Sequence, residues 1–313
     1  MDLLLIGLGV LLLYFGGDAL VKAAVALACQ WGVKPMVVGL TVVALGTSTP
    51  ELFASLLATL RGNTDIALGN VVGSNIANIG LILGVTALIA PIRTHARFLR
   101  REVPFMLGVA VVLQVLVVTG GVSRLAGGLL LAGVALYLVV LLRGGESSDV
   151  EEEFAQEYGE SSEKSPARAW LRLGVGLLLL AGGAQLLIIG ATGIARSLGV
   201  PELTIGLSLV ALGTSLPELF ASVVAAVRRE PDIALGNIVG SNILNVLVVL
   251  GASALAGPLP VAADSGVVWD VGIMLTLSVL LLPFLITGLR LGRREATLLL
   301  LSYGGYVFYL YSS

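Results

Sequence analysis

Long apolar segments separated by short polar ones run along nearly the whole chain. A helix that crosses a lipid bilayer needs about 20 predominantly apolar residues. On that scale the pattern predicts ten membrane-spanning helices, near residues 3–27, 36–60, 66–90, 103–119, 124–142, 170–195, 203–227, 233–256, 267–287 and 295–311. The predicted fold class is therefore an all-α integral membrane protein.

The composition agrees with this prediction. The mean hydropathy is +1.01, and only 12% of the residues are charged, whereas soluble proteins carry about 25%. The single cysteine, Cys29, excludes an intrachain disulfide, and the single histidine, His95, excludes a multi-histidine metal site. We expect no cofactor, no nucleic acid and no obligate protein partner, and a lipid bilayer as the surroundings.

A polar stretch at mid-chain separates the predicted helices into two groups of five. Residues 143–168 contain "GGESSDVEEEFAQEYGESSEKS", which is acidic, rich in Ser and Gly, and without an apolar face. This composition is typical of a flexible linker. We therefore divide the chain into a first five-helix repeat (1–142), an acidic linker (143–168) and a second five-helix repeat (169–313).

The two halves are copies of one another. When residues 32–84 are set against 199–251, an offset of 167, 32 of the 53 positions are identical. The shared blocks include "VALGTS", "PELFAS", "DIALGN" and "VGSNI". Because each copy has an odd number of spans, the second copy must enter the membrane from the opposite side, which predicts an inverted repeat.

The distribution of basic residues predicts the orientation. Lys and Arg gather on the cytoplasmic side of bacterial-type membrane proteins. With the N-terminus outside, only Arg61, Arg124 and Arg196 of the 18 lysines and arginines fall on outer ends. We therefore expect a multi-pass protein of the cell (inner) membrane, with both termini outside and the linker in the cytoplasm.

Two glutamates interrupt the apolar pattern at equivalent places. Glu51 in "ALGTSTPELFAS" and Glu218 in "ALGTSLPELFAS" lie near the middle of the second and seventh predicted spans. A charge at this depth costs at least about 2.5–3.5 kcal/mol on insertion scales. No lysine or arginine lies at matching depth in those spans. A bound cation, a proton or both should therefore neutralise the carboxylates.

The neighbouring residues would suit a cation. Pro50 and Pro217 each remove a backbone donor, which should free main-chain carbonyls at about 44–47 and 211–214. Hydroxyl and amide oxygens lie close by in both copies: Thr47, Ser48, Ser74 and Asn78 in the first, and Thr214, Ser215, Ser241 and Asn245 in the second. All of these donors are oxygens, which suits Ca²⁺ and also Na⁺, but not soft transition metals.

These motifs resemble a known family. The "GTSTPEL" and "GTSLPEL" segments, followed by "GNVVGSNIAN" and "GNIVGSNILN", are similar to the α-repeats of prokaryotic sodium/calcium exchangers in the cation/Ca²⁺ antiporter superfamily. The resemblance covers essentially the whole chain. It implies four central cation sites that Ca²⁺ and Na⁺ share in turn, and it implies that the first and sixth spans slide as a gating pair.

The resemblance also implies a role for individual residues. Glu51, Glu218 and the carbonyls of Thr47 and Thr214 would form the Ca²⁺ site. The flanking Na⁺ sites would be completed by Ala44, Ser74, Ala211, Ser215 and Ser241, and the middle site would be lined by Asn78 and Asn245. Several exchangers carry an acidic residue at the position of Asn245, so this chain departs from them and leaves the counter-ion, Na⁺ or H⁺, open.

The buried acids and the broken helices favour a transporter over a channel or an enzyme. The leading hypothesis is a secondary antiporter that exchanges Na⁺ for Ca²⁺ by alternating access, and the alternative is a Ca²⁺/H⁺ antiporter of the same fold. A cation channel is disfavoured, because inverted repeats with broken helices favour alternating access. An intramembrane hydrolase would need a base near Ser48, and no histidine or lysine is placed to activate it. We therefore expect a transporter and not an enzyme.

Overall fold

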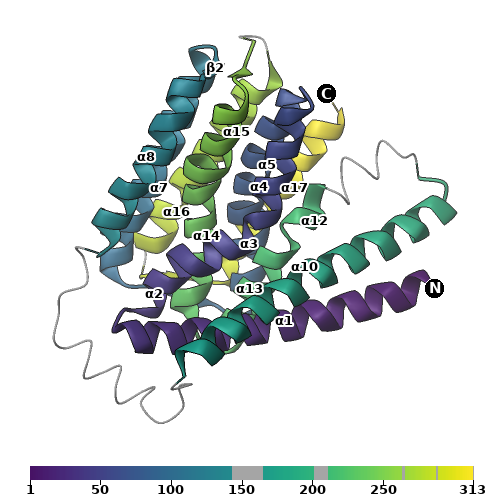
Figure 1. Cartoon of the computed structure of the whole chain (residues 1–313), viewed down its shortest axis with the longest axis vertical. Coiled ribbons are helices and arrows are strands. Elements are labelled where there is room, and N and C mark those ends of the chain that lie inside the picture. Colours follow the sequence, from purple (N-terminus) through teal and green to yellow (C-terminus); the bar gives the residue numbers. More distant parts are fainter. Residues whose placement is uncertain (143–164, 201–210, 263–264, 287, 313) are drawn as a thin grey trace. The chain divides into compact units, whose positions relative to one another are not determined.

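The computed structural model describes residues 1–142, 165–200, 211–262, 265–286 and 288–312 (Figure 1). The chain folds as two compact units. Unit 1 comprises Met1–Thr47 and Gly145–Asn237, and unit 2 comprises Ser48–Gly144 and Ile238–Ser313. Each unit therefore combines a segment from each half of the sequence repeat. Most of the expected linker, 143–164, and the first part of the expected seventh span, 203–210, lie outside the described residues.

Helices dominate both units. The helices of unit 1 are α1 (Asp2–Trp31), α2 (Pro35–Val38), the π-helix η1 (Gly39–Val43), α3 (Ala44–Thr47), α10 (Pro166–Ser197), α12 (Ala211–Thr214) and α13 (Leu216–Val227). Helix α14 (Pro231–Leu244) begins in unit 1 and ends in unit 2. The remaining helices of unit 2 are α4 (Thr49–Leu60), α5 (Thr64–Ala77), η2 (Asn78–Leu83), α6 (Gly84–Ile89), α7 (Ala96–Val118), α8 (Arg124–Leu142), η4 (Asn245–Leu250), α15 (Gly251–Ala256), α16 (Gly266–Ile286) and α17 (Arg293–Ser312).

These helices match the expected spans within a few residues at most ends. In the described part of the chain, six helices are long and apolar enough to cross a membrane, and a seventh is formed if the broken segment 35–60 is counted as one span. The shorter helices α8, α13 and α17 occupy the places of the expected fifth, seventh and tenth spans. Helix α10 begins at Pro166, so the last three residues of the predicted linker, 166–168, are helical.

In unit 1, α1 and α10 lie side by side as an antiparallel pair (Figure 1). A Cβ added at Gly9 would lie 2.8 Å from the carbonyl oxygen of Gly183, and one added at Gly16 would lie 2.9 Å from that of Gly176. Gly9 and Gly176 are equivalent in the repeat, as are Gly16 and Gly183. The contact is therefore symmetric, and small residues let the two backbones approach closely.

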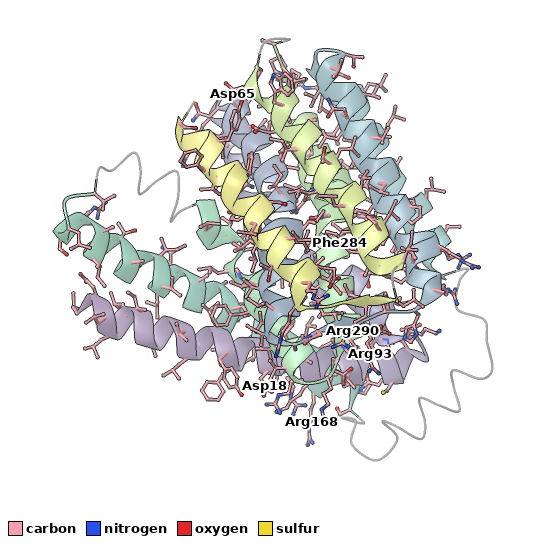
Figure 2. The ribbon with its side chains drawn as sticks, turned by 180° about the vertical axis from the view of Figure 1, so that it is seen from behind. Asp18, Asp65, Arg93, Arg168, Phe284 and Arg290 are labelled. Atoms are coloured by element: carbon pink, nitrogen blue, oxygen red, sulfur yellow. The ribbon has the colours of Figure 1, made fainter. Side chains whose placement is uncertain are left out.

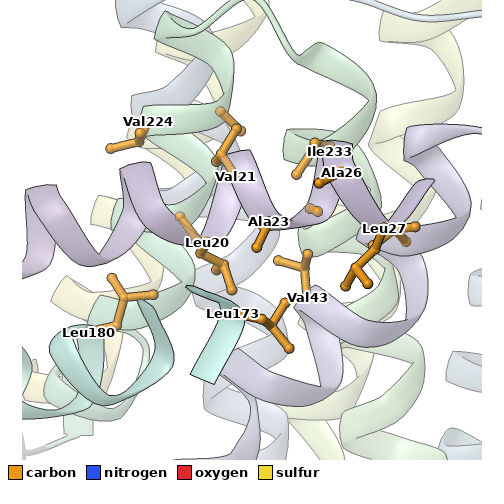
Figure 3. Close-up of a cluster of buried hydrophobic side chains, with 14 of the residues drawn as sticks. Leu20, Val21, Ala23, Ala26, Leu27, Val43, Leu173, Leu180, Val224 and Ile233 are labelled. Atoms are coloured by element: carbon orange, nitrogen blue, oxygen red, sulfur yellow. The ribbon is translucent and has the colours of Figure 1, made fainter. Parts of the chain in front are cut away.

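An apolar cluster surrounds this helix pair in unit 1. Leu13, Leu20 and Leu27 of α1 are fully buried and belong to one cluster with residues of α10, α13 and the start of α14. Figure 3 shows Leu20 and Leu27 in this cluster. The cluster also includes Val43, the last residue of η1. Helix α1 ends where Gly32 takes the left-handed conformation, with φ 63°, a helix stop that glycine adopts without steric cost.

Two short strand pairs reveal the inverted repeat in unit 2. Strand β1 (Ile92–Arg93) pairs antiparallel with β4 (Arg290–Leu291), and β2 (Gly121–Val122) pairs with β3 (Leu259–Pro260). Strands β1 and β3 are equivalent in the repeat, so each pair joins the loop after a third span to the loop before a fifth span of the other copy. The apolar pattern did not predict these strands, because each has only two residues.

The strand pairs agree with the predicted topology. In the predicted orientation the loops of β1 and β4 both lie on the cytoplasmic side, and the structure pairs Arg93 with Arg290. Figure 2 shows these two arginines together at one end of unit 2 and Asp65 at the other end. The topology also places Asp65 on the opposite side of the membrane from the two arginines. Which of the two ends faces the cytoplasm remains a prediction.

The glycine contacts of unit 1 yield a stability test. Gly9→Ala should lower the thermal midpoint of the purified protein, because its methyl group would meet α10 backbone at under 3 Å and overpacking costs about 1–3 kcal/mol. Gly7→Ala is the matched control, since no described residue lies within 4 Å of a Cβ at this position. Equal midpoints for the two variants would contradict the α1–α10 contact.

Candidate functional site

Both predicted glutamates lie in the first turn of a helix that begins after a break. The breaks fall at Ser48, with φ −80° and ψ 4°, and at Ser215, with φ −91° and ψ 4°. Glu51 and Glu218 are each only 1% exposed. The start of a helix carries a partial positive charge, which favours an anionic side chain there. The fold therefore lowers the cost of holding each carboxylate in the protein interior.

The prolines explain the breaks. Pro50 and Pro217 are the second residues of α4 and α13. Neither can donate the backbone hydrogen bond that a continuous helix would send to the carbonyl of Gly46 or Gly213. The short helices α3 and α12, which cover the residues expected to offer carbonyls, end directly before the breaks.

In unit 1, Asn237 of α14 forms hydrogen bonds to α13, the helix that contains Glu218. Its Nδ2 donates to the Glu218 main-chain oxygen at 3.3 Å and to Ser222 Oγ at 2.9 Å. Its Oδ1 accepts from Thr47 Oγ1 at 3.0 Å. Asn237 is fully buried, so one side chain connects α14, α13 and α3 through three hydrogen bonds.

Unit 2 repeats this arrangement around Glu51. Asn70 of α5 donates from Nδ2 to the Glu51 main-chain oxygen at 3.1 Å and to Ser55 Oγ at 2.8 Å. Asn70 and Asn237 are equivalent in the repeat, and Ser55 is equivalent to Ser222. These residues were not among the predicted ligands. Their signal was present, since they belong to the shared blocks "PELFAS" and "DIALGN".

A second group of asparagines meets inside unit 2. Asn75 and Asn78 come from the first copy, and Asn242 and Asn245 are their equivalents in the second. Asn245 Nδ2 donates to Asn75 Oδ1 at 3.0 Å, and Asn78 Nδ2 donates to Asn242 Oδ1 at 3.0 Å. All four side chains are at most 3% exposed. The bonds cross between the two copies, which brings the predicted site residues Asn78 and Asn245 into one network.

Several oxygens in this region have no hydrogen-bond partner among the described residues. They are Oδ1 of Asn78, Oδ1 of Asn245 and Oγ of Ser241, and each is fully buried. A buried polar oxygen without a partner costs about 1–3 kcal/mol. A cation that accepts these oxygens as ligands would remove that cost.

The helices that contain these asparagines change from α-helical to π-helical winding at Asn78 and Asn245. Asn78 and Asn245 are the first residues of the π-helices η2 and η4. Short π-helical turns are rare and occur frequently at functional sites. Sequence reasoning did not predict them, since a π-helical turn changes the local winding without changing the apolar pattern.

The structure distributes the predicted site residues over both units. Unit 1 contains Ala44, Thr47, Ala211, Thr214, Ser215 and Glu218, and unit 2 contains Ser48, Glu51, Ser74, Asn78, Ser241 and Asn245. Their side chains are buried, except that Thr214 is half-buried and that Ala211 is placed only by its backbone, at the start of α12. In the described part of the chain, no three His, Cys, Asp or Glu side chains gather. A cation site in either unit would therefore need hydroxyl, amide or main-chain oxygens.

Buried carboxylates at broken helices, repeated in two inverted copies, define a membrane transporter of the inverted-repeat class. The sequence profile of the sodium/calcium exchanger protein family matches residues 1–143 and 168–312. The chain therefore belongs to this family, as its motifs indicated.

Similar proteins agree with this assignment. The sodium/calcium exchanger MaX1 of Methanosarcina acetivorans is 34% identical, with 99% of this chain and 98% of that protein covered. The putative antiporter CaxA of Alkalimonas amylolytica is 39% identical, with 97% of each protein covered. A solved structure of the sodium-calcium exchanger NCX_Mj superposes with a TM-score of 0.84 at 31% identity, covering 98% of this chain and 97% of that one. This likeness confirms the expected all-α membrane fold.

The contacts of Asn237 give a second prediction. Asn237→Ala removes three buried hydrogen bonds and should destabilise the protein by about 3 kcal/mol, at about 1 kcal/mol each. Ser222→Ala, which removes one of them, should cost about a third as much. Thermal unfolding of the purified variants in detergent measures both. An Asn237→Ala midpoint no lower than that of Ser222→Ala would contradict the role of Asn237 as a connector.

Proposed function

We propose that this protein exchanges Na⁺ for Ca²⁺ across the membrane, with Glu51 and Glu218 as the charged ligands of the transported ions. The family supports a cation/Ca²⁺ antiporter. MaX1 and NCX_Mj are named sodium/calcium exchangers, which supports Na⁺ as the counter-ion. The observation that carries the proposal is the repetition of a buried glutamate in the first turn of α4 and of α13.

Charge balance supplies the mechanism. Two ionised glutamates carry a charge of −2, which one Ca²⁺ or two Na⁺ would neutralise. A third Na⁺ would leave an excess of +1 and make the exchange electrogenic. An uncompensated charge is costly at membrane depth. The empty, ionised site would therefore change slowly from one access state to the other. Each change of access would then carry either Ca²⁺ or Na⁺, which couples the two fluxes.

The neutral ligands would complete the coordination. Thr47 and Thr214 would offer main-chain carbonyls beside the glutamates, with Ser48 and Ser215 next to them. Ala44 and Ala211 would contribute carbonyls, and Ser74, Asn78, Ser241 and Asn245 side-chain oxygens. Ca²⁺ takes six to eight oxygen ligands, which this set supplies. The amide at 245 takes up no proton, so proton exchange would rest on Glu51 and Glu218 alone.

The proposed organisation follows the sequence. Residues 1–142 and 169–313 form the two inverted repeats, and 143–168 connects them. The termini lie outside, and the linker lies in the cytoplasm. The asymmetry of lysine and arginine supports this orientation.

Uptake of ⁴⁵Ca²⁺ into proteoliposomes tests the counter-ion. Vesicles loaded with Na⁺ and diluted into Na⁺-free medium should accumulate Ca²⁺, whereas vesicles with a K⁺ gradient or a pH gradient should not. Uptake driven by the pH gradient alone would identify a Ca²⁺/H⁺ antiporter. Uptake that requires no counter-ion gradient would indicate a channel.

The same assay tests the glutamates. Glu51→Gln and Glu218→Gln should each lower Na⁺-driven uptake about 100-fold or more, because losing one partner of a buried charge contact costs about 3–5 kcal/mol. Asp65→Asn is the matched control, since this exposed acid lies at the start of α5, and its uptake should equal that of the wild type. Wild-type uptake in either glutamine variant would show that the ions bind elsewhere.

A further inference from the structure

We infer that Asn75 and Asn242 are positioning residues, which hold the amide groups of Asn245 and Asn78 with their carbonyl oxygens toward the transported cation. The inference rests on the proposed function, because it assigns a role to side chains that support its ligands. Neither residue is among the predicted ligands. Asn75 and Asn242 are each 3% exposed, so both side chains are buried inside unit 2.

The orientation of Asn75 follows from its partners. Its Nδ2 lies 3.2 Å from the main-chain oxygen of Asn242 and 3.6 Å from Met274 Sδ. A main-chain carbonyl can only accept a hydrogen bond, and a thioether has no proton to donate. Both contacts therefore require the NH₂ end of Asn75 to point at them. Its Oδ1 must then point the other way, toward Asn245.

The orientation of Asn245 follows in turn. Asn75 Oδ1 is an acceptor, so Asn245 must present its NH₂ group, and the 3.0 Å contact is a donation from Asn245 Nδ2. The Oδ1 of Asn245 is left facing away from Asn75. It has no hydrogen-bond partner among the described residues and is fully buried. Asn75 thus converts an amide that could turn either way into a fixed carbonyl ligand.

The second copy repeats the arrangement. Asn242 Nδ2 lies 3.7 Å from Met106 Sδ, which leaves its Oδ1 to accept from Asn78 Nδ2 at 3.0 Å. The Oδ1 of Asn78 is also buried and without a partner in the described part of the chain. Each positioning residue therefore serves the ligand of the opposite copy. The four amides form one crossed network that links α5 to the end of α14.

This network should matter for ion affinity more than for folding. An amide that is free to flip can turn its NH₂ protons toward a cation, whereas a held carbonyl is ready to bind. Outer residues that orient a ligand in this way typically change metal affinity about 10–100-fold when they are replaced. The network adds no charge, so it would tune binding without altering the balance set by the two glutamates.

A double-mutant cycle between Asn75 and Asn245 tests the inference. The readouts are the half-saturating Ca²⁺ concentration for ⁴⁵Ca²⁺ binding to purified protein and for uptake into proteoliposomes. Asn75→Ala should raise half-saturation about tenfold with little change in maximal rate. In an Asn245→Ala background, Asn75→Ala should add less than about twofold, because its target is gone. Equal shifts in both backgrounds, or no shift in either, would overturn the inference.

One control variant and one alternative cycle keep the test decisive. Ile76→Ala removes more buried side-chain volume than Asn75→Ala does, on the same turn of α5. The isoleucine side chain has no hydrogen-bonding group, so this variant changes packing alone. It should lower the thermal midpoint without moving half-saturation, and a shift like that of Asn75→Ala would mean that loose packing is the cause. If Asn75→Ala cannot be purified, the equivalent cycle between Asn242 and Asn78 takes its place.

The outcome separates this inference from the proposed function. Should Asn245→Ala leave half-saturation unchanged, the amide at 245 is not a ligand and the inference fails. Na⁺-driven uptake by the wild type is measured independently, so the exchange function would stand. Loss of Na⁺ coupling in the wild type would instead overturn the proposed function.

Discussion

The structure depends on the cost of keeping a carboxylate away from water. Glu51 and Glu218 are almost completely buried, and a charge in that position is tolerated only when its surroundings compensate for it. The chain provides part of the compensation locally. A proline-containing break places each glutamate in the first turn of a new helix, where the helix dipole favours a negative charge. The remainder is what we assign to the transported cations.

Because the sequence is duplicated, the contacts around the two glutamates occur in both copies. The same asparagine contact holds the main-chain oxygen of each glutamate, through Asn70 in one copy and Asn237 in the other. The same glycine pairs bring α1 and α10 together, and the same loops pair as short strands at the two ends of unit 2. An inverted repeat presents equivalent chemistry from both sides of the membrane, as alternating access requires.

Much of the fold could be predicted from hydropathy and from the repeat, because both are properties of the sequence alone. The observed helix ends differ from the predicted ones where charged residues extend a helix beyond its apolar segment. Helix α7 begins at Ala96 and not near 103, because Arg97, Arg100 and Arg101 continue the helix beyond the apolar segment. The glutamates were found because a charge within an apolar run is conspicuous. Asn75 and Asn242 were not, although both lie inside the quoted motifs. Their role depends on which residue of the other copy they face, and hydropathy carries no information on tertiary partners.

The central claim is that Na⁺ and Ca²⁺ compete for the same pair of buried carboxylates. Equilibrium binding of ⁴⁵Ca²⁺ to the purified protein, measured against rising Na⁺ at constant ionic strength, tests it most directly. Because one Ca²⁺ neutralises both glutamates and one Na⁺ does not, displacement by Na⁺ should be steeper than first order. Choline should displace no Ca²⁺. Binding that Na⁺ and choline reduce equally, or that Na⁺ leaves unchanged, would contradict the account.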